Sequence, residues 1–161
     1  MILGVNIMIH QNKEINMFHI VNQIKDLGIH LIITSLDNSQ SGFIVYDENT
    51  KLFSITINAN HGVKRQNFTM AHELAHYVLH KDIVMQRGQL DRDSSNLYSN
   101  EDKILEREAN RLAGNLLMPL QAIRDIISIN NFDINNQEHI QQIADIFVVS
   151  EEALKIQMRN L

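Results

Sequence analysis

Residues 64–80 constrain the fold most, because they combine a helical apolar pattern with two histidines one turn apart. The apolar positions of this segment recur every three or four residues: Phe68, Ala71, Ala75, Val78 and Leu79. That period predicts a helix with one face toward a core. His72 and His76 share a face of such a helix, so both imidazoles can reach one ion.

The sequence between these histidines completes a known metal-binding pattern. Glu73 follows His72 directly, which gives the H-E-x-x-H zinc motif on the helix that the motif requires. In a chain with eight histidines, a chance match is on the order of a few per cent. We therefore predict zinc bound by His72 and His76, with Glu73 as the base that takes a proton from the attacking water.

A catalytic zinc ion usually has three protein ligands and one open position, so the pattern requires a further ligand. Glu106 and Asn110 are four residues apart in a segment of helical character and share a face. Glu106 is the expected third ligand, and Asn110 is expected to hydrogen-bond a ligand histidine. Glu108 points about 160° away from that face. For Glu108 we expect a surface salt bridge to Arg107 or Arg111.

The sequence does not identify the donor that stabilises the tetrahedral oxyanion of peptide hydrolysis. Tyr77, His80 and Tyr98 are candidates for this role or for lining the cleft. His80 lies four residues beyond His76, and we favour a supporting or surface role for it over metal ligation. Arg65 precedes the motif, and we expect it to pair with an acid rather than to dock a substrate carbonyl.

The chain contains no cysteine. A disulfide framework, a thiolate metal site and a cysteine nucleophile are therefore excluded. Any metal must be held by His, Asp or Glu side chains. We predict about one zinc ion (Zn2+) per chain, although manganese (Mn2+) or iron (Fe2+) would suit the same ligands.

Composition excludes some classes of protein. Hydrophobic residues make up 44% and charged residues 20% of 161 residues, which is typical of a folded domain. The formal net charge of −5 argues against nucleic acid as a direct partner. Residues 1–9 are apolar but too short to cross a bilayer, and they lack the flanks of a signal peptide. We expect a cytoplasmic protein with no membrane contact.

The order of predicted elements indicates an α+β domain. An N-terminal helix over residues 12–27 ends at a Gly28 cap. Apolar runs at residues 29–36, 42–46 and 52–57 predict a small antiparallel three-stranded sheet, with a hairpin around residues 47–50. Residues 81–99 are polar and are expected to form a loop.

Helices are expected to make up the rest of the chain. Ser99 and Asp102 resemble a capping box that would open a helix over residues 100–117. Pro119 suits the first turn of a helix ending near Asn130, and two further helices are expected at residues 137–147 and 151–160, the last capped by Ser150. We expect one domain over residues 1–161, with a core at about 12–119 and a C-terminal helical part at about 120–161.

Residues 65–80 and 106–119 resemble the ImmA/IrrE family of gluzincin-like zinc metallopeptidases, in which an H-E-x-x-H helix is followed by a helix with the pattern E-x-E-A-N and a Leu-Leu-Met-Pro turn. The likeness covers about residues 12–119, and residues 140–161 resemble the family's usual ending. Leu112 departs from the family, which often has Phe there. Alignment to the family's pattern also makes Glu106 the third ligand.

The resemblance implies an endopeptidase that cleaves a regulatory protein, typically a helix-turn-helix repressor or an antitoxin, and so derepresses genes. Two alternatives stay open: a binding module that sequesters such a partner without cutting it, and a zinc hydrolase of small amides. Residues 140–160 also have the spacing of a helix-turn-helix unit. However, Glu151 and Glu152 would face the phosphates, so we favour a packing role there.

Overall fold

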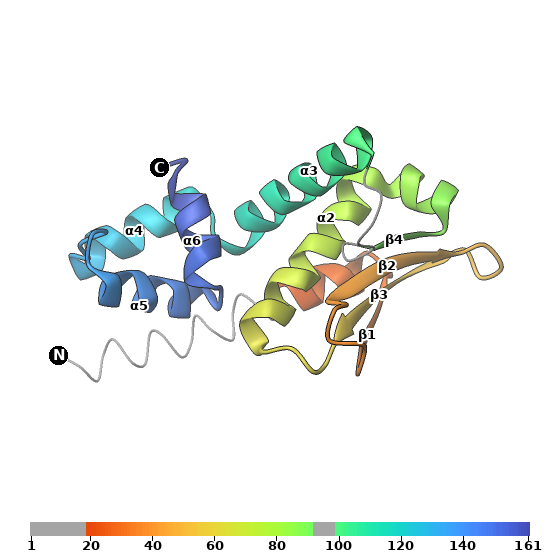
Figure 1. Ribbon diagram of the computed structural model, residues 1–161, viewed down its shortest axis with the longest axis horizontal. Helices are drawn as coiled ribbons and strands as arrows, with labels where there is room; N and C mark the ends of the chain where they lie inside the picture. The colour runs from red at the N-terminus through yellow and green to blue at the C-terminus, as the bar shows by residue number, and fades with distance from the viewer. Residues whose placement is uncertain (1–18, 92–98) are drawn as a thin grey trace.

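The computed structural model describes residues 19–91 and 99–161. Its centre is a sheet whose strands lie in the order β1, β3, β2, β4, with one long helix across a face and three helices grouped beyond it (Figure 1). The strands are β1 (His30–Thr34), β2 (Gly42–Asp47), β3 (Leu52–Asn58) and β4 (Gln89–Asp91). The helices are α2 (Val63–Arg87), α3 (Asn100–Leu117), α4 (Leu120–Asn130), α5 (Gln137–Phe147) and α6 (Glu151–Met158). The predicted α+β class is confirmed.

The sheet differs from the expected three-stranded antiparallel one in two respects. β2 and β3 form the expected antiparallel hairpin, but β1 pairs with β3 in parallel. A fourth strand, β4, pairs antiparallel with β2. Both differences come from pairing between segments distant in the chain, which a local apolar pattern does not encode.

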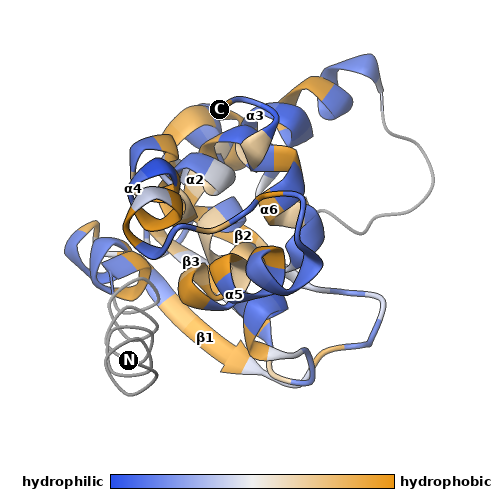
Figure 2. Cartoon of the chain, turned by 90° about the vertical axis from the view of Figure 1, so that its left-hand side faces the viewer, coloured by the Kyte–Doolittle hydropathy of each residue, from blue (hydrophilic) through white to orange (hydrophobic). Residues whose placement is uncertain are grey.

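β1 forms an apolar edge of this sheet. Figure 2 shows it coloured largely as hydrophobic, and Ile32 and Ile33 are exposed. Before it, residues 19–26 are helical and Gly28 has a φ of +70°, as expected for a helix-ending glycine. The expected start of that helix at residue 12 lies outside the described residues.

Helix α2 extends further than the sequence predicted. The helix continues past His80 to Arg87, with a kink at His80, where φ is −127° and ψ is 24°. Buried Val84 anchors the added turns, and the amide of Gly88 closes the helix on the Val84 carbonyl. The expected loop over residues 81–99 is therefore wrong as far as β4, and residues 92–98 lie outside the described part.

Helix α3 begins at Asn100, as the predicted capping box of Ser99 and Asp102 indicated. The Ser99 hydroxyl accepts a hydrogen bond from the Asp102 amide (3.1 Å), and the Asp102 carboxylate accepts one from the Ser99 amide (3.0 Å). Arg87 at the end of α2 also donates to Asp102 (2.6 Å). These contacts fix the entry of α3 beside α2, so that the two helices pack along each other (Figure 1).

The sheet face beneath α2 allows a close approach. Ile44, Ile55 and Ile57 are fully buried and belong to the same core cluster as Met70 and Leu74 of α2. At the edge of this contact Gly42 has no room for a side chain. An added Cβ would lie 2.5 Å from the Thr56 carbonyl oxygen and 2.7 Å from Cγ2 of Thr69.

Hydrogen bonds from polar side chains connect the C-terminal helices to α2 and to the end of α3. Asn67 of α2 donates to the carbonyl of Val148 (3.1 Å), which ends α5 in a left-handed conformation (φ +54°). Gln157 of α6 donates to Asn115 (2.8 Å) and to the Met118 carbonyl (3.1 Å). The helices α4, α5 and α6 thus hold a fixed position beside the start of α2.

None of the helices described here has an apolar stretch of the length that a bilayer requires.

Candidate metal centre

The metal-binding pattern lies in the middle of α2, on its face toward α3. His72 and His76 are both buried, and their Nε2 atoms are 3.0 Å apart. The helix places them one turn apart, as the spacing predicted. Burial removes both rings from water, so their nitrogen atoms need partners inside the protein.

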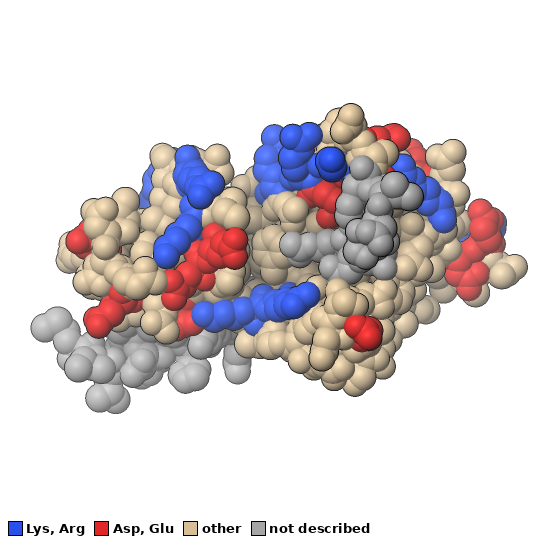
Figure 3. Space-filling model, in the orientation of Figure 1, with Lys and Arg blue, Asp and Glu red and all other residues tan. Residues whose placement is uncertain are grey.

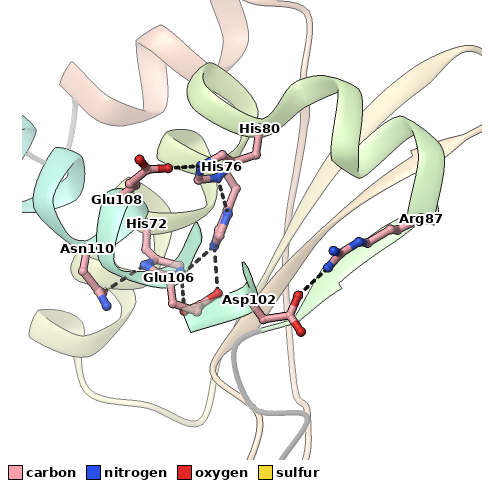
Figure 4. Close-up of polar contacts among 8 residues, drawn as sticks. All are labelled: His72, His76, His80, Arg87, Asp102, Glu106, Glu108 and Asn110. Carbon is pink, nitrogen blue, oxygen red and sulfur yellow. Dashed lines mark hydrogen bonds and ion pairs between the residues drawn. The ribbon is translucent and has the colours of Figure 1, made fainter. Parts of the chain in front are cut away.

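Glu106 of α3 meets the two histidines. Its carboxylate oxygens lie 3.3 Å from His72 Nε2 and 3.1 Å from His76 Nε2 (Figure 4). The ligand atoms of all three residues lie within 4.8 Å of one another, and they form a group that could hold a metal ion. The sequence thus identified the residues that the two helices bring together.

Asn110 occupies the supporting position expected from its spacing. Its side-chain oxygen lies 3.1 Å from Nδ1 of His72. Because a side-chain amide oxygen only accepts, His72 Nδ1 carries the proton and donates it to Asn110. This hydrogen bond leaves the lone pair of His72 Nε2 directed at Glu106 and His76.

His76 has a supporting chain of its own. Nδ1 of His76 lies 3.1 Å from Nδ1 of His80, and Nε2 of His80 lies 3.1 Å from the Glu108 carboxylate. The carboxylate accepts from His80 Nε2–H, so His80 Nδ1 is the acceptor for His76 Nδ1–H. His80 is therefore a buried bridge between a ligand histidine and Glu108.

This chain corrects the expectation for Glu108. The sequence predicted a surface salt bridge with Arg107 or Arg111, but Glu108 pairs with His80 (Figure 4). His80 contacts Nδ1 of His76, whereas Glu106 contacts Nε2 of the same ring. The helical angle describes where the Cα–Cβ bond points, whereas the flexible glutamate side chain reaches back to α2. His80 and Glu108 lie on different helices, so no spacing in the sequence indicated this contact.

The hydrogen bonds around the two histidines indicate which nitrogen atoms could bind a cation. Each ligand histidine uses its Nδ1 proton on an outer partner, so each Nε2 carries a lone pair. When both rings are neutral, these two nitrogen atoms and the partly buried Glu106 carboxylate form three converging acceptors with no donor among them. Two imidazoles and one carboxylate are the donor set of a catalytic zinc site, so the residues fit a divalent ion.

The electrostatics of Glu106 agree with a cation-binding role. Partial burial would raise the pKa of this carboxyl, but hydrogen bonds from His72 and His76 and the positive charge of these rings when protonated outweigh it and lower the pKa far below its usual value. Glu106 is therefore ionised at neutral pH and supplies a full negative charge to the cluster. Metal ligation requires this deprotonated form.

The remaining predicted site residues differ in where they lie. Glu73 is 1% exposed within α2, next to His72. Tyr77 packs on Phe53 of β3, and its hydroxyl accepts a hydrogen bond from Lys81 (3.3 Å), so these contacts direct it toward the sheet. Tyr98 lies outside the described residues.

Arg65 also differs from its expectation. Its guanidinium donates to the Ser41 hydroxyl (2.6 and 3.2 Å), and within the described residues it forms no ion pair with an acid. The expected pairing is therefore not found there. Arg65 instead stands at the rim of a cleft.

This cleft, which the sequence did not predict, is separated from His72 by the side chains of Phe68 and Asn110. It has a volume of about 1080 Å³ and runs between the start of α2, α3 and α6. Phe68 and Asn110 line it, and both also contact His72. The cleft therefore comes within one side chain of His72, although none of the three candidate ligands lines it.

The His-His-Glu cluster could hold a metal ion, as a metallopeptidase-like protein requires. The sequence matches the peptidase M78 family, described as the IrrE N-terminal-like domain, over residues 24–159. The chain belongs to this family, which confirms the resemblance. A comparison with curated proteins found no match.

Proposed function

We propose that the protein is a zinc-dependent endopeptidase that cleaves a regulatory protein, a helix-turn-helix repressor or an antitoxin, and so derepresses genes. The observation that carries the catalytic part is the convergence of His72, His76 and Glu106, with their outer hydrogen bonds in place. Membership of a peptidase family supports the same reaction class.

The residues of the cluster have distinct roles in this proposal. A zinc ion held by His72, His76 and Glu106 would polarise the scissile carbonyl and lower the pKa of a water molecule toward neutrality. Glu73 accepts the proton of the attacking water and delivers it to the leaving amine. Its burial strengthens this role, because exclusion of bulk water strengthens electrostatic interactions.

Two features of the structure favour a polypeptide over a small amide as the substrate. The cleft beside His72 is at the upper end of the sizes usual for small-molecule sites. In addition, β4 is the last strand of the sheet in the described chain, so an extended peptide could pair with its outer edge. A regulatory protein as the substrate is the expectation that the family resemblance supplies.

A comparison of the wild type with Glu73→Gln separates this proposal from a binding module that only sequesters its partner. The assay incubates each zinc-loaded protein with candidate helix-turn-helix regulators from the same genome and follows fragments by mass spectrometry. We expect cleavage by the wild type only, with equal zinc content in both proteins. Full relief of repression by Glu73→Gln would show that cleavage is not the function.

A further inference from the structure

The charges that line the cleft oppose the charge of the whole protein. Four of the five charged side chains on its described walls are basic: Lys64, Arg65, Arg107 and Arg111, against Glu152. The chain as a whole has a formal net charge of −5. Figure 3 shows basic side chains gathered over α3 and over the start of α2. The cleft is therefore a local positive region on an acidic protein.

The arginines of the cleft are not neutralised within the described residues. Arg107 donates to the Lys103 carbonyl (3.1 Å) and Arg65 to the Ser41 hydroxyl, so neither pairs with a carboxylate there. Arg111 makes no hydrogen bond or ion pair in that part of the chain. By contrast, Lys64 pairs with Asp145 at 2.6 Å. Each of the three guanidiniums keeps at least one Nη group that could donate to an anion.

Two of these arginines form a matched pair. Arg107 and Arg111 are four residues apart on α3 and therefore project from the same face, where like charges repel. In the sequence they stand on either side of Asn110, which hydrogen-bonds the candidate ligand His72. An anionic group that bound both arginines would lie in the cleft that Asn110 also lines.

Apolar side chains complete the walls. Val63 at the start of α2 and Ile156 on α6 are 51% and 53% exposed and both line the cleft. Phe68 and Met118 add further apolar surface. A nucleic acid strand would leave these aliphatic groups uncovered and would meet Glu152, whereas a peptide with acidic and apolar side chains suits both kinds of wall.

We propose that this cleft binds a segment of the protein substrate in which an acidic side chain lies beside an apolar one, with Arg107 and Arg111 binding the carboxylate. The proposal rests on the proposed peptidase function and specifies its substrate. The apolar side chain of the segment packs against Val63 and Ile156. The acidic side chain sets the position of the chain relative to His72.

The test measures binding rather than cleavage. Zinc-loaded full-length protein with Glu73→Gln is titrated against fluorescently labelled peptides of equal length and identical leucines, whose polar positions are all Glu, all Gln or all Lys. Anisotropy should show the Glu peptide binding about tenfold tighter than the Gln peptide. High salt should reduce this preference, because it screens charge.

Variants identify the residues responsible. Arg107→Gln combined with Arg111→Gln should abolish the preference for the Glu peptide. Lys103→Gln removes one positive charge from the same helix outside the cleft and should leave the preference unchanged. Equal binding of the Glu and Gln peptides, no measurable binding of either, a preference that survives the double substitution, or tighter binding of oligothymidine would each overturn the proposal.

The outcomes also separate this inference from the proposed function. Tight binding of the Glu peptide by a protein whose wild type binds zinc but hydrolyses no protein would leave the cleft assignment standing and refute the peptidase. Cleavage of a regulator by the wild type with no acidic preference would do the reverse.

Discussion

Replacing Glu108 with alanine should weaken zinc binding about tenfold, although this residue is not a ligand. Its carboxylate accepts from His80 Nε2 at 3.1 Å, and His80 in turn accepts from His76 Nδ1. Loss of an outer partner of a ligand histidine usually lowers metal affinity by about 10- to 100-fold. The Glu108 side chain is 47% exposed, so water can replace it and the loss should fall at the lower end, about 1.4 kcal/mol.

Two further variants grade the same chain of contacts. His80→Ala deprives the buried Nδ1–H of His76 of its acceptor, so its loss should approach 100-fold, about 2.7 kcal/mol. Glu108→Gln keeps an acceptor oxygen and should lose less than Glu108→Ala. Because the hydrogen bond is the cause, affinity should rank wild type, Gln, Ala, with His80→Ala weakest.

Competition against a chromophoric zinc chelator at neutral pH measures these affinities. Glu101→Ala is the matched control, since Glu101 lies on the same helix with a 70% exposed side chain 3.8 Å from Arg87. It should bind zinc as the wild type does. If Glu108→Ala and His80→Ala both bind zinc within about twofold of the wild type, the support that we assign to this chain is refuted.

Three other predictions concern stability. Gly42→Ala should destabilise the fold by about 1–3 kcal/mol, because the added Cβ meets the Thr56 carbonyl and Thr69. The unfolding temperature should fall by about 2–4 °C for each kcal/mol lost. The control Gly62→Ser, at a helix N-cap with open space around it, should show no such fall. Hydrogen bonds from Arg87 and Ser99 lower the pKa of Asp102, so its stabilising effect is full above its unfolded pKa near 3.8 and is lost as pH falls through the folded value. Asp102→Asn should therefore flatten the acid side of the stability profile, and an unchanged profile in acid titration would contradict this. Zinc should stabilise the wild type by about 2.7 kcal/mol when the free zinc concentration is one hundred times the dissociation constant, which a thermal scan detects as a higher unfolding temperature. Glu106→Ala should show little response in the same scan.

Local signals account for the parts of the fold that the sequence predicted well. The cap at Ser99 and Asp102 marks the start of α3, and the polar turn at residues 47–50 marks the hairpin. The extension of α2 past His80 was missed because most residues from Lys81 to Arg87 are polar and only Val84 is fully buried. β1 and β4 were misjudged or missed because strand order depends on contacts between distant segments.

The candidate site shows the same division. Spacing within one helix placed His72 beside His76 and Glu106 on the face of Asn110, because helical geometry is regular. The pairing of Glu108 with His80 and the cleft between α2, α3 and α6 depend on how separate helices pack. No periodicity within either helix reports that packing, so only the assembled structure revealed them.

The most direct test of the account is the metal content of the purified protein beside that of Glu106→Ala, measured by inductively coupled plasma mass spectrometry after both have been supplied with zinc. The account predicts about one zinc ion per wild-type chain and a clear loss in the variant, because the three-ligand cluster loses its carboxylate. A wild type that holds no metal under these conditions would contradict the metal centre and the peptidase function built on it.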